Sequence, residues 1–566
     1  MNKNRTLLKL IAGLAAFAVL AGLLIIYVVR FMPVSKRMSA GDYFGSLEEN
    51  EAAVIAEDHL AEGRAVRMED RWFIDYALVQ SELNPRFYWD ESAGLMLFTT
   101  ASEIYEIPAD SSAYLTGEGT QDAGYTVIKT TENGKYVDLE FLREHSDFTY
   151  EIYEDPGRIV ISRGSRTVTS AVVKKNSAVR YLGGIKSLVL TEAQKGSEVV
   201  ILEQMEHWSQ IRTADGYIGY IKNSSLTEIS EQTRPSVYTG PEYTSLSMED
   251  RVSLVWHQID YAQMNDNFDE DTAQMSGVNV ISPTWYFLSD NEGNIDSLAD
   301  ASYVKQAHEA GLQVWALISN FSADVSTAEL LASRAARQKV QDYLIAQAEE
   351  IGFDGINIDF EGIPETAGYS YVQFMRELSI LCRERGLYLS VDVPVPMDFS
   401  SHYDRKELGV VCDYVIMMGY DEHYAGSDIV GSVASMDFER NGIENMLSEV
   451  PGEKIVSAIP FYTRLWYTRT LEDGTVSVTS EALGMGSAWD VVEQNGVAAV
   501  WDDDAGQPYA EWTNAEGVFC QIWLEDDSTV AERASMVSEY DLGGIAAWVL
   551  GREKDYVWQV ISENIR

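Results

Sequence analysis

The octapeptide DGINIDFE, residues 354–361, alternates polar and apolar side chains. Because successive side chains of a β-strand point to opposite faces, Asn357, Asp359 and Glu361 share one face and the apolar residues between them share the other. Three polar groups in a row on a buried face cost free energy unless they serve a purpose. The stretch therefore predicts a strand that carries a functional row ending in Glu361. The alternative is an acidic strand end that caps the next helix.

Seven further strand-like apolar runs lie on either side of this octapeptide. Together the eight runs are Val252–Trp256, Val278–Ser282, Gln313–Ser319, Gly355–Phe360, Leu387–Val393, Tyr414–Met418, Ile455–Ile459 and Ile545–Val549. Helical patterns separate them, as at Thr327–Ile351 and Tyr371–Arg385. Eight β-α units predict a (β/α)8, or TIM, barrel over residues 248–566. Barrel enzymes build their active sites at the carboxyl ends of the strands, which is where Glu361 falls.

The gap between the seventh and eighth runs is longer than a barrel loop requires. It contains short β-like pieces at 475–478, 497–501 and 509–512. We predict an inserted α+β subdomain over about residues 467–525 that walls one side of the cleft.

Two modules rich in β-structure are predicted ahead of the barrel. Residues 51–165 contain short apolar runs, such as Arg71–Ile74 and Leu95–Phe98, separated by turn residues, which indicates a β-rich or α+β module. Residues 167–228 indicate a small β-barrel whose last hairpin turns at Asp215-Gly216. Residues 31–50 read as a short polar stalk.

The N-terminus predicts a membrane anchor. An uncharged, largely apolar run extends from Leu10 to Val29, between Lys9 and Arg30. A helix of this length matches the ~30 Å hydrocarbon core of a bilayer. A cleaved signal peptide is the alternative, but the residues after Tyr27 make a poor cleavage site. We expect residues 1–30 to be a short cytoplasmic tail and a transmembrane signal anchor, with the bulk of the chain outside the cell.

The composition excludes one class of partner. The 566 residues include 89 acidic and 42 basic ones, which gives a net charge of −47 at pH 7. Such a charge repels phosphate backbones, so we do not expect nucleic acid as a partner. The sequence has neither a phosphate-loop pattern nor His and Cys residues at metal-ligand spacing, so no cofactor and no metal are expected.

The octapeptide resembles the signature Asp-Gly-x-Asp-x-Asp-x-Glu of glycoside hydrolase family 18, the chitinase-like (β/α)8 enzymes. Further segments resemble the family's motifs at the expected strands: Met418-Gly419-Tyr420-Asp421 at the sixth, Ile459-Pro460-Phe461-Tyr462 at the seventh and Gly543–Trp548 at the eighth. Within the family, the chain is similar to the spore-germination and cell-wall N-acetylglucosaminidase branch. Ahead of the barrel, residues 51–165 resemble the repeat named after the N-terminal domain of copper amine oxidases, and residues 167–228 resemble a bacterial SH3-like domain.

The resemblance implies a substrate-assisted retaining glycosidase, in which the acetamido oxygen of the substrate is the nucleophile. Glu361 is then the general acid and base. Asp359 would hydrogen-bond the acetamido N–H, while Tyr420 and Asp421 would bind and orient the acetamido oxygen. Trp548 would form an apolar floor beneath the sugar.

Four further aromatic residues are candidates for sugar contacts in the cleft: Trp285, Tyr286, Tyr462 and Trp512. Asn357 stands where the family has the first aspartate of its inward row. We count Asn357 as a substrate-binding residue, and we expect its neutral amide to alter the pH profile without abolishing activity.

These implications predict a membrane-anchored enzyme of the cell surface that hydrolyses β-1,4 bonds in glycan containing N-acetylglucosamine. Peptidoglycan is favoured over chitin, because the anchor and the two appended modules face the cell wall. The alternatives are a weakly active or non-catalytic lectin that binds cell-wall glycan, and a scaffold in which the N-terminal modules matter most. The SH3-like domain is expected either to bind wall peptide or to act as a spacer.

Overall fold

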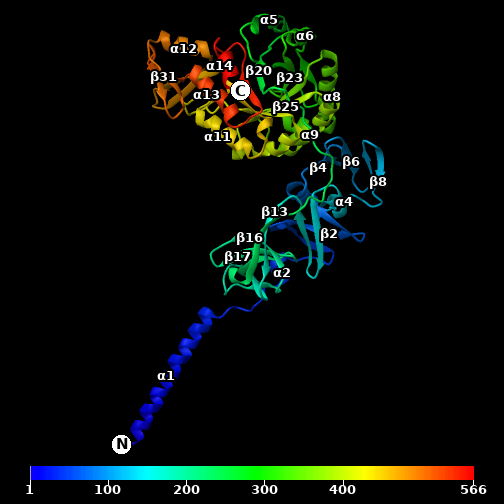
Figure 1. Cartoon of the computed structure of the whole chain (residues 1–566), viewed down its shortest axis with the longest axis vertical. Coiled ribbons are helices and arrows are strands. Elements are labelled where there is room, and N and C mark those ends of the chain that lie inside the picture. The colour runs from blue at the N-terminus through cyan, green and yellow to red at the C-terminus, as the bar shows by residue number, and fades with distance from the viewer. Residues whose placement is uncertain (1, 566) are drawn as a thin grey trace. The chain divides into compact units, whose positions relative to one another are not determined.

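The chain forms two compact units in the computed structural model, which describes residues 2–565 and the side chains from Lys9 onward (Figure 1). The first unit comprises Met1–Phe87 and Glu106–Gly240. The second comprises Tyr88–Tyr105 and Pro241–Arg566. All the candidate catalytic residues lie in the second unit.

An apolar helix, α1 (Asn2–Phe31), begins the first unit. Its segment Lys9–Phe31 is long and apolar enough to cross a membrane, and none of it is buried against the protein. A signal sequence near the N-terminus can also be this long and apolar, so the anchor and its alternative, a cleaved signal peptide, both remain predictions for this segment.

Two seven-stranded sheets make up most of the first unit. The first sheet contains, in spatial order, β11 (Phe148–Glu154), β12 (Gly157–Arg163), β1 (Glu51–Ala56), β2 (His59–Met68), β3 (Arg71–Asp75), β10 (Gly134–Asp138) and β9 (Ile128–Thr131). The second, SH3-like sheet contains β15 (Val189–Ala193), β14 (Ser177–Arg180), β18 (Ile218–Lys222), β17 (Trp208–Thr213), β16 (Glu198–Gln204), β13 (Thr167–Val173) and β19 (Leu226–Thr233). Short elements complete this part of the chain: α2 (Ala40–Phe44), α3 (Tyr76–Leu78), α4 (Leu139–Glu144), β6 (Ile104–Pro108), β7 (Ala113–Thr116) and β8 (Gly119–Asp122). The β-rich architecture predicted ahead of the barrel is confirmed.

Eight parallel strands close into a barrel in the second unit. In spatial order they are β20 (Val252–His257), β33 (Gly544–Trp548), β27 (Ile455–Pro460), β26 (Tyr414–Met418), β25 (Tyr388–Pro394), β24 (Gly355–Asp359), β23 (Gln313–Ser319) and β21 (Val280–Leu288). Pairing of β20 with β21 closes the circle. Each of the eight predicted runs overlaps one of these strands, so the predicted (β/α)8 barrel is confirmed.

Helices cover the outside of the barrel (Figure 1). The main ones are α6 (Ala301–Glu309), α8 (Arg334–Ile351), α9 (Gly368–Arg385), α10 (Arg405–Val411), α11 (Met436–Leu447), α13 (Asp527–Glu539) and α14 (Val557–Asn564). Ile356, Ile358 and Phe360 are fully buried in one cluster with apolar residues of these helices, such as Leu344 and Leu378. This outward packing leaves the polar residues between them facing the barrel interior, as the alternation along the strand requires.

An inserted subdomain separates the seventh and eighth barrel strands. It consists of β28 (Tyr462–Thr470), β29 (Val476–Gly484), α12 (Met485–Gln494), β30 (Val500–Asp502), β31 (Gln507–Thr513) and β32 (Phe519–Trp523). The five strands form one antiparallel sheet, with Leu465, Ala510 and Ile522 in its core. The subdomain therefore begins at Tyr462, earlier than the expected start near residue 467.

A hairpin from the N-terminal part of the sequence belongs to the second unit. It contains β4 (Phe87–Asp90) and β5 (Leu95–Thr99), and residues 88–105 group with the barrel. Asp90 accepts a 2.7 Å bond from Arg337 on α8, which also bonds Glu377 on α9. Thr99 accepts a bond from Gln373 on α9. This grouping differs from the expected single module over residues 51–165.

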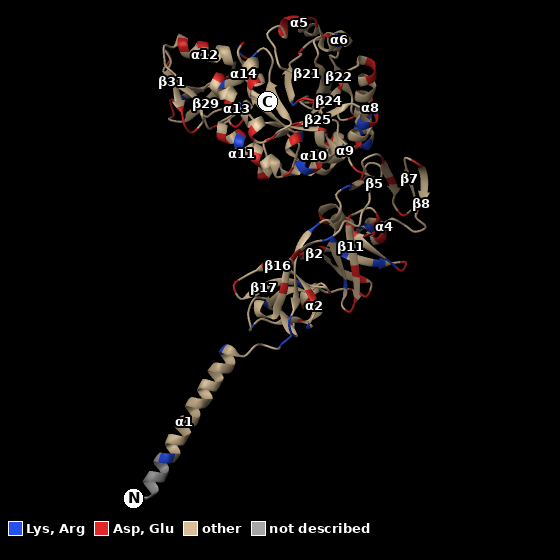
Figure 2. Cartoon of the chain, viewed as in Figure 1, with Lys and Arg blue, Asp and Glu red and all other residues tan. Residues whose placement is uncertain are grey.

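Charged residues are distributed over many elements of the chain (Figure 2). Both acidic and basic residues occur on several outer helices of the barrel domain, such as α8 and α11 (Figure 2). The net charge of −47 therefore reflects an excess of acidic residues over the whole chain.

Candidate active site

Glu361 lies two residues beyond the end of β24, at the carboxyl-end face of the barrel. The backbone there is held by one side chain, because Asn320, at the end of β23, bonds both polar groups of the Glu361 peptide. The Asn320 Nδ2 donates to the Glu361 carbonyl at 2.8 Å, and its Oδ1 accepts from the Glu361 N–H at 3.0 Å. A third bond, from Asn320 Nδ2 to Thr327 at 2.7 Å, fixes the amide. Glu361 therefore projects from a constrained backbone while its side chain stays open to the cleft.

Residues from six barrel strands or their ends, together with Tyr462 at the start of β28, line a cavity of about 180 Å³ beside Glu361. The lining residues are Trp256, Phe321, Asp359, Glu361, Asp392, Met418, Tyr420, Asp421, Tyr462 and Trp548. Six of the predicted site residues are thus brought together from distant positions in the sequence: Asp359, Glu361, Tyr420, Asp421, Tyr462 and Trp548.

Three carboxyl groups of this cavity, those of Asp359, Glu361 and Asp392, have a raised pKa. Burial raises the pKa of Asp359 well above its usual value, and the negative charges of Asp392 and Glu361 add to the shift. Burial between the cleft walls also raises the pKa of Glu361, helped by the charge of Asp421. A carboxyl with a raised pKa can remain protonated near neutral pH and act as a general acid.

Tyrosine hydroxyls face the same space. Tyr462 donates a 2.5 Å hydrogen bond to Asp421 Oδ1, which fixes the direction of that carboxylate. The Tyr420 and Tyr462 rings meet edge to face, with centroids 6.2 Å apart. Burial raises the pKa of Tyr420 well above its usual value, so its hydroxyl stays protonated and can donate a hydrogen bond. Trp548 and Trp256 form an aromatic wall with ring centroids 5.9 Å apart.

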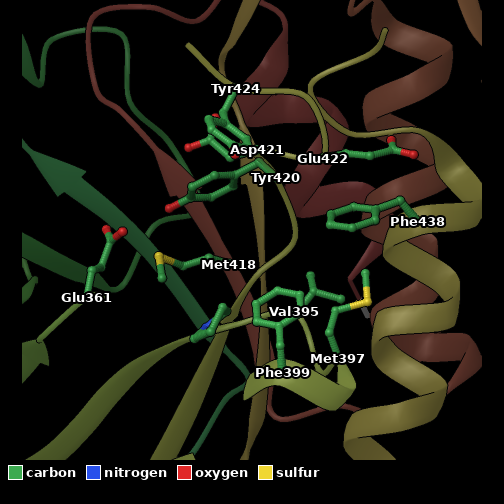
Figure 3. A pocket seen from close by; sticks show the side chains of 11 residues that line it. Glu361, Val395, Met397, Phe399, Met418, Tyr420, Asp421, Glu422, Tyr424 and Phe438 are labelled. Carbon is green, nitrogen blue, oxygen red and sulfur yellow. The ribbon is translucent and has the colours of Figure 1, made fainter. Parts of the chain in front are cut away.

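Two larger hollows continue the cavity, and all three meet at Glu361 and Met418. One, of about 420 Å³, lies between the segments that follow β25 and β26 and has apolar walls that include Val395, Phe399 and Phe438. Figure 3 shows the Tyr420 hydroxyl directed towards the side of this hollow where Glu361 lies. The other, of about 410 Å³, extends along the segment after Glu361 as far as His402. Glu361 thus stands at the junction of three adjoining hollows.

Asn357 lies beneath the cavity rather than in its lining. It is fully buried, and its Oδ1 accepts bonds from Trp256 Nε1 at 2.9 Å and Ser282 Oγ at 3.1 Å. Its Nδ2 donates to Asp392 Oδ1 at 2.8 Å. These bonds occupy the amide, which corrects the expectation that Asn357 contacts substrate.

Three predicted aromatic residues are not brought to the cavity. Trp285 and Tyr286 are fully buried between the barrel and its helices, where Trp285 bonds Asn265 and Tyr286 bonds Gln347. Trp512 packs against the core of the inserted subdomain. Full burial corrects the expectation that Trp285 and Tyr286 contact sugar, whereas Trp512 is half-buried and does not line the cavity beside Glu361.

Four residues of the cavity were missed in the sequence: Trp256, Phe321, Asp392 and Met418. Asp392 had a signal, because it is a lone carboxylate in the apolar run Leu387–Val393. Trp256 ends the first apolar run, where an aromatic residue is equally consistent with core packing. Phe321 follows a strand and is 60% exposed, which no periodic pattern indicates.

Both parts of the chain are similar to known protein families. Residues 219–553, more than half of the chain, match the family described as Glycosyl hydrolases family 18. Residues 186–226 match the family described as Bacterial dipeptidyl-peptidase Sh3 domain. The latter match falls within the SH3-like sheet.

Related sequences and a solved structure agree with the barrel assignment. The chain is 24% identical over 293 residues to the Uncharacterized glycosylase YvbX of Bacillus subtilis (strain 168), which covers 50% of this chain and 83% of that protein. It is 26% identical over 241 residues to the Cortical fragment-lytic enzyme of Bacillus subtilis (strain 168), which covers 42% of this chain and only 55% of that protein. The crystal structure of the C-terminal domain of a putative chitinase from Desulfitobacterium hafniense DCB-2 superposes with a TM-score of 0.52 at 22% identity, over 56% of this chain and 100% of that chain. The last likeness shows a shared fold.

Proposed function

The chain belongs to the glycosyl hydrolases family 18, and from this premise we propose that it cleaves β-1,4 bonds after N-acetylglucosamine with Glu361 as the general acid and base. The observation that carries the proposal is the single cavity lined by Glu361, Asp359, Tyr420 and Trp548. Cleavage of a glycosidic bond requires protonation of the leaving oxygen and stabilisation of an oxocarbenium-like transition state. The cavity offers groups suited to both requirements.

Glu361 supplies the proton in this proposal. Its raised pKa favours the protonated form that a general acid needs, and its position at the junction of three hollows lies next to any bond that crosses between them. After the leaving sugar departs, the same group, now a carboxylate, accepts a proton from the attacking water. The family's use of the substrate's acetamido oxygen as nucleophile makes a second catalytic carboxylate of the enzyme unnecessary and gives retention.

The neighbouring residues orient that acetamido group. Asp359 accepts a hydrogen bond from the acetamido N–H and balances the positive charge that develops on the ring formed by its oxygen. Tyr420 donates to the acetamido oxygen, and Asp421, held by Tyr462, limits its rotation. Trp548 forms the apolar floor beneath the reacting sugar. Each role matches the chemistry of a side chain that lines the cavity.

Peptidoglycan is the proposed substrate. The relative named Cortical fragment-lytic enzyme supports a wall-type glycan, although the chain spans about half of that protein's length. The SH3-like domain supports attachment to wall material. The helix Lys9–Phe31 supports a membrane anchor with the two units outside the cell. Chitin remains the second polymer to test, because the structural likeness to a putative chitinase concerns the same barrel.

Replacement of the acid tests the proposal. Full-length chain in detergent and its Glu361→Gln variant are incubated with purified peptidoglycan and with chitin oligosaccharides, and released reducing ends are measured. We expect kcat to fall by ~10²-fold or more, because the amide keeps the shape but cannot donate the proton. Glu384→Gln, an exposed change on α9, is the matched control and should leave activity unchanged. Equal sugar binding without turnover in both proteins would instead favour a lectin, and the preferred polymer identifies the substrate.

A further inference from the structure

Asp392 is a buried carboxyl of the cavity that has no role in the mechanism above. It lies on β25, whose pairing with β24 places Val391 beside Ile358, so the next residues, Asp392 and Asp359, lie side by side at the ends of adjacent parallel strands. Both side chains line the same cavity, and they are only 2% and 6% exposed. Two carboxyl groups therefore share one small, largely desolvated space.

Their hydrogen bonds are unequal. Asp392 Oδ1 accepts a bond from Asn357 Nδ2, and Asn357 cannot rotate because Trp256 and Ser282 both donate to its oxygen. Asp359 Oδ1, by contrast, is buried without a hydrogen-bond partner in the described part of the chain. An unpartnered buried carboxylate oxygen is costly, and a proton donor at this point would relieve the cost.

The described groups that face the pair supply no positive charge. The ionisable residues that face the pair are Glu361 after β24, Tyr371 on α9, Tyr403, Tyr420 and Tyr462 near the strand ends, and Asp421 after β26. Among the described residues that line the cavity there is no Lys, Arg or His. Two adjacent buried carboxyls without a cation cannot both ionise at modest cost, so they retain a proton between them. The pKa of each is accordingly raised, first by burial and then by a neighbouring carboxylate.

We propose that Asp392 shares one proton with Asp359 in the resting enzyme and keeps that proton when Asp359 acts as a carboxylate beneath the bound acetamido group. The inference rests on the proposed function for its catalytic meaning. In glycoside hydrolase family 18 the inward row begins with an aspartate, and Asn357 stands in its place in this chain. The proposal therefore assigns the missing carboxyl to Asp392 on β25. Asp392 is thus a positioning residue that acts through Asp359.

The proton step balances within the pair. An O–H bond on Asp359 breaks, an O–H bond on Asp392 forms, and the pair carries one negative charge before and after. The negative charge moves onto Asp359, where the substrate's N–H can be bound. The pair requires neither a cofactor nor a proton from solvent.

Titration of the carboxyl groups tests the sharing without any substrate. The infrared C=O band of protonated carboxyls is followed against pH in Glu361→Gln, which removes the third carboxyl, and in Glu361→Gln/Asp392→Asn. Two coupled groups lose their protons in two separated steps. We expect the band of Glu361→Gln to change in two steps that belong to the Asp359–Asp392 pair. In Glu361→Gln/Asp392→Asn we expect these two steps to be replaced by a single step of Asp359 at an intermediate pH. A remaining step that stays where it was would overturn the proposal.

Exchange of the two residues provides the second test. In Asn357→Asp/Asp392→Asn the new aspartate still accepts from Trp256 and Ser282, and the new asparagine can donate to it, so the network is preserved with the carboxyl moved to β24. Activity is measured on 4-nitrophenyl N,N′-diacetyl-β-chitobioside as a function of pH. We expect Asp392→Asn alone to lower kcat/KM by roughly 10-fold, less than loss of the general acid, and to remove one ionisation from the pH profile. The exchange should restore both.

A purely structural role for Asp392 predicts a different set of results. Asp392→Asn keeps the acceptor for Asn357 and would then leave the pH profile unchanged, while Asp392→Ala would lower stability and activity. That pattern, or an exchange variant that folds but fails to restore the lost ionisation, would refute proton sharing. If no form of the enzyme cleaves the glycoside, the proposed function fails, whereas the infrared titration still decides on the pair.

Discussion

Two groups of buried carboxylates in the second unit differ in what neutralises them. Glu439 on α11 and Glu525 after β32 both bond Arg533 on α13, at 2.6 and 2.8 Å, and all three side chains are almost completely buried. Asp359 and Asp392 are similarly buried, but no cationic side chain lines their cavity in the described residues. A carboxylate paired with a guanidinium has its charge satisfied within the framework. A buried carboxyl group without a guanidinium partner can instead interact with a ligand, either as a charged acceptor or as a proton donor.

The paired group should control stability. Burial lowers the pKa of Arg533, but the charges of Glu525 and Glu439 outweigh burial and hold it above the ordinary value. Arg533→Met removes the cation and leaves two carboxylates buried, so we expect a loss of about 3–5 kcal/mol in the free energy of unfolding. Denaturant titration measures the loss. Arg440→Met, which removes a partly exposed ion pair of α11, should cost less than about 1 kcal/mol. Similar losses for the two variants would contradict the comparison.

The unpaired group should control activity at no cost to stability. Asp359→Asn retains the shape of the side chain but removes the charge that would stabilise the transition state, so we expect kcat to fall by ~10²-fold. Thermal unfolding at neutral pH should occur at the same or a higher temperature, because an unpartnered buried carboxyl is replaced by a neutral group. A variant that loses activity only in proportion to lost folded protein would place Asp359 in the framework instead.

Stability should depend on pH in the direction set by the cavity. Asp359 and Asp392 have folded-state pKa values above those of the unfolded chain, about 3.9 for Asp. Between those values the folded state binds more protons than the unfolded state, so their contribution to stability is present at low pH and is lost as the pH rises through the folded pKa. As the pH rises, the unfolding free energy of the wild type should therefore fall relative to that of Asp359→Asn. A difference that shifts the other way would show that the folded-state pKa is depressed.

Loss of a single hydroxyl should produce the smallest effect. Tyr462→Phe removes the 2.5 Å bond to Asp421 but keeps the ring. Hydrogen bonds to charged groups contribute about 1.5–3 kcal/mol, so we expect kcat/KM to fall by about 10-fold. Stability should change little, because Asp421 is exposed to the cleft and can be solvated. Tyr540→Phe, which removes a surface hydroxyl bonded to Glu444, should leave kcat/KM unchanged.

The barrel could be predicted from the sequence because its strands are apolar runs with a regular spacing. The polar row on β24 could be predicted because polar and apolar residues alternate within one short segment. Trp285 and Tyr286 were misplaced for a local reason as well: β21 extends to Leu288, and its pairing with β23 shifts register between Thr284 and Tyr286, so strand alternation does not give their direction. Asp392 stands out in its run as a lone carboxylate, but its role could not be assigned. That role depends on Asp392 lying next to Asp359, and neither apolar run by itself gives the register between the two strands. The same limit applies to residues 88–105, whose strands are recognisable but whose packing partners are more than 240 residues away.

The hairpin of residues 88–105 bears on how this enzyme can be divided and inherited. The chain passes between its two compact units three times, at Phe87/Tyr88, Tyr105/Glu106 and Gly240/Pro241. A gene fragment that begins after residue 240 would lack Asp90 and leave Arg337 with one carboxylate partner fewer in a fully buried position. Recombination at the apparent boundary would therefore separate the barrel from a hairpin that bonds α8 and α9.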